Sequence, residues 1–107
     1  MAVRRPWPDS GRNADAVRTY TRLLQMDPDN APAYESMGVA QLQARDLRAA
    51  ESSLRKALAL DQTLAAAHTA LGVLLAQTGR KAEAIEAWKR AAALGDLNAA
   101  DNLRAIR

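Results

Sequence analysis

Residues 31–64, APAYESMGVAQLQARDLRAAESSLRKALALDQTL, align without a gap with residues 65–98, AAAHTALGVLLAQTGRKAEAIEAWKRAAALGDLN. The identical positions are spread along both segments and are mostly small or apolar: Ala31/Ala65, Ala33/Ala67, Gly38/Gly72, Val39/Val73, Gln43/Gln77, Ala50/Ala84, Ala57/Ala91, Ala59/Ala93 and Leu60/Leu94. Self-similarity at a fixed period of this length indicates a stacked repeat protein, in which each unit buries its apolar face against the next.

Each 34-residue unit predicts two helices. Alanine and leucine, both strong helix formers, dominate the apolar residues, and phenylalanine is absent. In the first unit the helices are expected at about Ala31–Ala44 and Leu47–Leu60, with Asn30 as an N-cap. In the second unit, Gly79 and Gly95 are expected to end the two helices. The intervening loops are short, so consecutive helices must pack antiparallel.

The pattern extends beyond these units in both directions. Residues 11–30 align with residues 45–64 and predict one helix, from about Asn13 to Met26. Pro6 and Pro8 forbid a preceding helix there, because proline removes a backbone donor and clashes with the preceding turn. At the other end, a closing helix is expected from about Asn98 to Ile106, covering the helix that carries Trp88.

Taken together, these residues resemble the tetratricopeptide repeat, whose period is also 34. That family places a small residue where its two helices approach most closely, and Gly38 and Gly72 stand there. Its second helix carries an early alanine and then a large apolar residue, and the matching pairs are Ala16 with Tyr20, Ala50 with Leu54, and Ala84 with Trp88. One departure is His68, which stands where the preceding unit has the family's aromatic residue, Tyr34.

The resemblance implies an all-α fold, an α-solenoid of antiparallel helix pairs. We expect about two full repeats, a leading half repeat and a closing helix. The expected organisation is an irregular N-terminal segment, residues 1–10, followed by a repeat domain, residues 11–107.

Composition and charge exclude several classes of function. The chain has no cysteine, and its net charge of +3 is dispersed rather than gathered in one basic patch, so we expect no nucleic-acid partner. No run of apolar residues is long enough to span a membrane, and the N-terminus lacks the apolar core of a signal peptide. The expectation is a cytoplasmic protein without a membrane partner.

No constellation of side chains predicts catalysis, a metal or a cofactor. His68 is the single histidine, and a lone histidine makes neither a triad nor a metal site. Its position favours a packing role. Glu83 and Glu86 lie on a helix that also carries Lys89 and Arg90, which is typical of ion pairs on a solvated face. The chain is therefore predicted not to be an enzyme.

The resemblance implies a binding surface on a concave groove lined by the first helix of each pair. The residues expected there are Glu35, Val39, Leu42, Gln43, Thr69, Val73, Ala76, Gln77 and Arg104. This mixed, fairly apolar lining suits an extended segment or a helix of a partner protein. It does not suit the acidic C-terminal peptides that some members grip with several cations, because Arg104 is the only candidate cation.

Three alternatives remain open from the sequence. The leading half repeat lacks a covering helix, so Val17, Tyr20 and Leu24 could form a surface for homodimerisation or for preceding repeats of a longer array. The chain could also serve as an accessory domain of a larger protein. A helical-repeat RNA binder is disfavoured by the dispersed charge and by the absence of aromatic residues on the groove.

Overall fold

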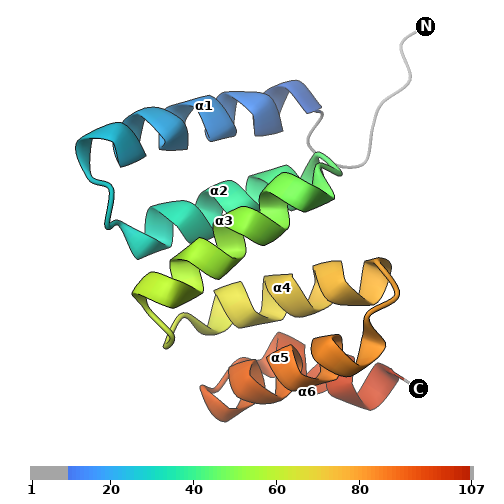
Figure 1. The fold of residues 1–107 in the computed structure, drawn as a ribbon. Helices are drawn as coiled ribbons and strands as arrows, with labels where there is room; N and C mark the ends of the chain where they lie inside the picture. The colour runs from blue at the N-terminus through green and yellow to red at the C-terminus, as the bar shows by residue number, and fades with distance from the viewer. Residues whose placement is uncertain (1–9, 107) are drawn as a thin grey trace, which may run out of the picture.

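The computed structural model describes residues 10–106 of the chain, which form helices joined by short turns. The helices are α1 (Ser10–Met26), α2 (Ala31–Gln43), α3 (Leu47–Leu60), α4 (Ala65–Gln77), α5 (Lys81–Ala93) and α6 (Leu97–Ala105). Figure 1 shows them stacked in chain order from α1 to the α5–α6 end, each running back along its predecessor. The predicted all-α solenoid is confirmed.

Helix bounds agree closely with those expected from the repeat. The bounds of α3 are those predicted, and α2 ends one residue early. The first helix begins at Ser10 rather than Asn13, and the closing helix begins at Leu97 rather than Asn98. The expectation that residues 1–9 are irregular concerns a segment outside the described residues.

Side chains and backbone conformations at the turns explain where the helices begin and end. The Asn30 side chain accepts a hydrogen bond from the backbone N–H of Ala33 at 3.0 Å, as predicted for an N-cap. Asp96 caps α6 in the same way, through the N–H of Ala99. Gly79 ends its turn in the left-handed region at φ 79°, and Arg45, one repeat earlier, adopts φ 69° despite its side chain.

The two helices of each pair touch at their glycine. A Cβ atom on Gly38 would stand only 2.7 Å from Cγ of Leu54, and one on Gly72 would overlap the indole ring of Trp88. Any larger residue would force the helices of the pair apart. The small residue in each first helix is therefore a condition for burying the large residue in the second.

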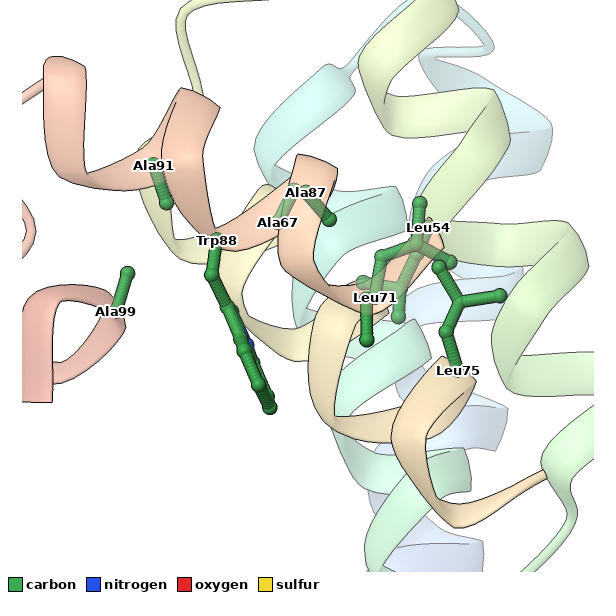
Figure 2. Packing of buried hydrophobic residues seen from close by; sticks show 9 residues of the cluster. Leu54, Ala67, Leu71, Leu75, Ala87, Trp88, Ala91 and Ala99 are labelled. Carbon is green, nitrogen blue, oxygen red and sulfur yellow. The ribbon is translucent and has the colours of Figure 1, made fainter. Parts of the chain in front are cut away.

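The core runs along these contacts. Leu54 of α3 lies against Leu71 and Leu75 of α4, and Trp88 of α5 extends past Ala67 (Figure 2). The closing helix α6 contributes Ala99, which is fully buried in the same cluster. The last helix thus covers the face of α5 that carries Trp88, as the sequence predicted.

An ion-pair network joins the two full repeats. The guanidinium of Arg80, in the turn before α5, donates to both carboxylate oxygens of Glu51 on α3, at 3.1 and 2.6 Å. Arg55 donates to the same carboxylate at 3.0 Å. The hydrogen bond from Arg80 is the main reason that the pKa of Glu51 is lowered from its ordinary value.

Glu51→Gln is expected to lower the free energy of unfolding by about 1 kcal/mol or less at neutral pH, since the pair is partly exposed. Because the folded-state pKa of Glu51 is lowered, its contribution is complete above the pKa of an unpaired glutamate and disappears as the pH falls through the folded-state value. Urea unfolding at pH 7 and pH 3 should therefore show a difference from the parent chain at pH 7 only. Glu86→Gln, which breaks the exposed pair with Lys89, is the control. A loss of equal size at both pH values would contradict the role of charge.

Candidate functional site

The first helices of the two full repeats lie side by side, and α2 contacts α4 directly. Glu35, Val39 and Leu42 are spaced so that they share one face of α2, and Thr69, Val73 and Ala76 occupy the matching face of α4. We call these six residues the α2/α4 face. All six are partly buried, whereas Gln43 and Gln77, at the last positions of their helices, are exposed.

The apolar part of this face rests on the core. Val73 and Ala76 pack against the buried cluster with part of their surface and leave the rest accessible. Such residues are held in place from below and do not need to be ordered by a ligand, which reduces the entropic cost of binding.

Glu35 places a carboxylate on this otherwise weakly polar face. Partial burial raises the pKa of Glu35 above its ordinary value. No hydrogen bond or ion pair to Glu35 is formed by the residues between 10 and 106. Its charge is therefore uncompensated by the part of the chain that the structure describes.

Two predicted groove residues are engaged elsewhere. The hydroxyl of Thr69 lies 3.0 Å from a carboxylate oxygen of Asp96 and 3.1 Å from the carbonyl of Ala65. Arg104 forms an exposed ion pair with Asp101 on its own helix. Arg104 is thus held by a neighbour three residues away, and Thr69 links α4 to the start of α6.

Asp96 is a positioning residue that the sequence analysis missed. Its carboxylate caps α6 through one oxygen and meets Thr69 through the other. The capping role has a sequence signal, an aspartate immediately before a helix. The contact with Thr69, 27 residues earlier, has none.

The residues proposed for self-association are not all on an open surface. Leu24 is only 8% exposed, which corrects the expectation that it lies uncovered; Val17 and Tyr20 are partly buried. The reason is the register of the repeat. Leu24 aligns with Leu58, which packs toward the following unit, and α1 packs on α2 in the same way.

The positions that lack a cover in α1 are those of the helix-pair contact. Leu54 and Ala57 of α3 are fully buried under α2. Their counterparts in α1 are Tyr20, partly buried, and Leu23, 36% exposed. The accessible apolar edge of α1 is therefore formed by Tyr20 and Leu23.

Histidine and acidic side chains form no chemical centre. His68 is buried, and its Nε2 donates to the carbonyl of Gln62 at 3.0 Å. Glu86 pairs with Lys89, as the spacing predicted. Between residues 10 and 106, no group of three or more His, Cys, Asp or Glu side chains is placed to hold a metal ion. None of the helices described in the structure is both long and apolar enough to cross a membrane.

A family model described as tetratricopeptide repeat matches residues 9–65 and, overlapping them, residues 36–102. The chain belongs to the tetratricopeptide repeat family. Tetratricopeptide repeats generally mediate protein–protein interaction and form a non-catalytic scaffold family. No match to the chain is found among curated proteins.

Solved tetratricopeptide structures share the fold. The first tetratricopeptide domain of Spaghetti (RPAP3), bound to the HSP90 peptide SRMEEVD, superposes with a TM-score of 0.83 at 24% identity, over 88% of this chain and 76% of that one. The second domain of the same protein, bound to the same peptide, has a TM-score of 0.76 at 25% identity and 78% coverage of both chains. MamA has a TM-score of 0.74 at 28% identity, over 78% of this chain. This chain spans about half of MamA, 48% of its length.

Proposed function

We propose that the chain is a non-catalytic scaffold whose α2/α4 face binds a segment of a partner protein. The observation that carries this proposal is the row of partly accessible apolar side chains, Val39 and Leu42 on one helix and Val73 and Ala76 on its neighbour, supported by the core. Two adjacent helices with such a row suit an extended peptide or an amphipathic helix. The peptide-bound Spaghetti domains, which have this fold, support the choice of partner.

The charge on the face narrows the partner. Glu35 is partly desolvated and has no partner among the described residues, so a negatively charged segment would be repelled there and a basic one attracted. The peptide bound by the Spaghetti domains contains consecutive glutamates. We infer that this chain prefers an apolar segment carrying a lysine or arginine to an acidic tail of that kind.

Val39→Glu combined with Val73→Glu is expected to weaken peptide binding at least about tenfold, because each change places an uncompensated charge in an apolar contact. The probe is a fluorescent peptide selected on the parent chain from a random phage-displayed library, and the readout is fluorescence polarisation. Ala59→Glu with Ala82→Glu is the matched control: it adds the same charge at exposed positions of α3 and α5. Circular dichroism checks that both variants keep their helices.

The outcome of this comparison decides the site. Loss in the Val39/Val73 variant alone supports the α2/α4 face. Equal binding by both variants, or selected peptides that are predominantly acidic, would contradict the site or its charge preference.

A second candidate function, self-association, is favoured by the accessible edge of α1. Tyr20 and Leu23 leave apolar surface uncovered at the positions that α2 and α4 cover in the other pairs. Light scattering coupled to size exclusion across a wide concentration range measures it directly. A constant monomer mass would remove this candidate and leave the α2/α4 face.

A further inference from the structure

A different face of the molecule carries an open hollow that the α2/α4 face does not share. It has a volume of about 650 Å³ and lies where α3, α4 and α5 meet. Leu71, Leu75 and Ala87 form its apolar part, beside the buried His68, and Arg90 stands at its edge. Its volume falls within the range of about 300–1,000 Å³ typical of small-ligand sites.

The corresponding junction one repeat earlier is built differently. Tyr34, 34 residues before His68, places its ring there, and the ammonium of Lys56 lies 5.8 Å from the ring centroid. Such a pair is stabilised by the attraction between a cation and the face of an aromatic ring. Lys56 is itself 34 residues before Arg90. The first junction therefore combines a ring and a cation that belong to the same chain.

The second junction keeps the cation and lacks the ring. His68 is smaller than tyrosine and is held by its hydrogen bond to the Gln62 carbonyl. Arg90 is exposed and forms no ion pair or ring contact with the described residues, including Glu86, with which its spacing would allow a pair. The guanidinium is thus free to cover a ring supplied from outside.

The lining of the two junctions also differs in polarity. In the first, Ser53 donates a hydrogen bond to the side chain of Gln41 at 2.6 Å. In the second, the same two positions are Ala87 and Leu75, which offer only apolar surface. An apolar surface beside an uncommitted guanidinium favours an aromatic side chain over a polar or purely aliphatic one.

We propose that this hollow is a docking site for an aromatic side chain of a partner protein. The ring lies against Leu71 and Leu75 beneath the guanidinium of Arg90, in the arrangement that Tyr34 and Lys56 form one repeat earlier. The site is separate from the α2/α4 face and stands or falls independently of it. It would give the scaffold a second contact point, so that one partner could be held on two faces or two partners at once.

The test uses the whole chain, labelled with ¹⁵N, and the probe N-acetyl-phenylalaninamide. Titration should shift the backbone amides of Leu71, Leu75 and Ala87, with a dissociation constant on the order of 1 mM for so small a ligand. N-acetyl-leucinamide, the aliphatic control probe, should bind several-fold more weakly. Arg90→Gln should remove most of that difference between the two probes.

Two variants convert the second junction into the first. His68→Tyr supplies the ring from the chain itself and should weaken binding of the aromatic probe at least tenfold. Leu75→Gln with Ala87→Ser recreates the polar pair and should also weaken it, which keeps the test decisive if His68→Tyr fails to fold. Thermal unfolding followed by circular dichroism establishes that each variant is folded.

Three results would overturn the proposal. The first is equal affinity for the two probes, and the second is a set of shifts confined to the α2/α4 face. The third is movement of the same amides on concentrating the chain without probe, abolished by Trp7→Ala, which would assign the hollow to a second copy of the chain. Loss of aromatic binding in the variants, with the parent preferring the aromatic probe, establishes the site.

Discussion

Leu54→Ala should lower the free energy of unfolding by about 3 to 5 kcal/mol. Leu54 is fully buried at the point where α3 meets both α2 and α4, beside Gly38 on one side and in the cluster with Leu71 and Leu75 on the other. Removing its side chain leaves a cavity that neither neighbouring helix can fill without moving. A small domain has about 5–15 kcal/mol of stability in total, so this single change removes a large part of it.

The matched control for this prediction lies on the same helix. Leu60 is 40% exposed, so Leu60→Ala removes the same atoms with little loss of burial and should cost less than about 1 kcal/mol. Urea unfolding followed by circular dichroism measures both variants under one set of conditions. Similar costs for the two substitutions would mean that Leu54 does not hold the repeats together.

Trp88→Ala is expected to destabilise the chain by about 3 to 5 kcal/mol. Trp88 is 5% exposed, and its indole N–H donates to the backbone carbonyl of Thr69 at 3.1 Å. The substitution creates a cavity and leaves that carbonyl without its donor. The same unfolding measurement checks the prediction, and the loss of α6 contacts should accompany it, because Ala99 packs in the same cluster.

The close approach of Gly72 to Trp88 makes a stricter test, because it predicts a change of sign. In the parent chain a Cβ atom at position 72 would overlap the indole ring, so Gly72→Ala should destabilise by about 1 to 3 kcal/mol. In the Trp88→Ala background the ring is gone. The same substitution should then stabilise, by up to about 1 kcal/mol, since alanine favours the helix more than glycine does. A destabilising effect of equal size in both backgrounds would show that the indole is not what requires glycine.

Much of the fold was predictable because its signals are local or strictly periodic. Glycine at positions 38 and 72, with a large apolar residue at positions 54 and 88, marks the helix-pair contact in each repeat. The structure places these residues in contact as the pattern requires. Helix bounds followed from capping residues and breakers near each end, which act over a few residues.

The candidate site was predictable only in part. Helical spacing identified which residues share one face of α2 and of α4, since that depends on periodicity alone. It did not identify the engagement of Thr69 by Asp96 or the pairing of Arg104 with Asp101. It also misplaced Leu24, because an amphipathic helix does not reveal which neighbour covers each part of its apolar stripe.

By itself the sequence determined the helix-pair repeat, its period, the antiparallel order of the helices and the glycine contacts, because each of these depends on spacing within one repeat. Only the tertiary structure decided how consecutive repeats meet: the link from Arg80 to Glu51, the uncompensated charge of Glu35 and the hollow beside His68. These features depend on the sizes and distances of side chains from different helices. Two repeats with the same pattern can therefore build one filled junction and one open junction.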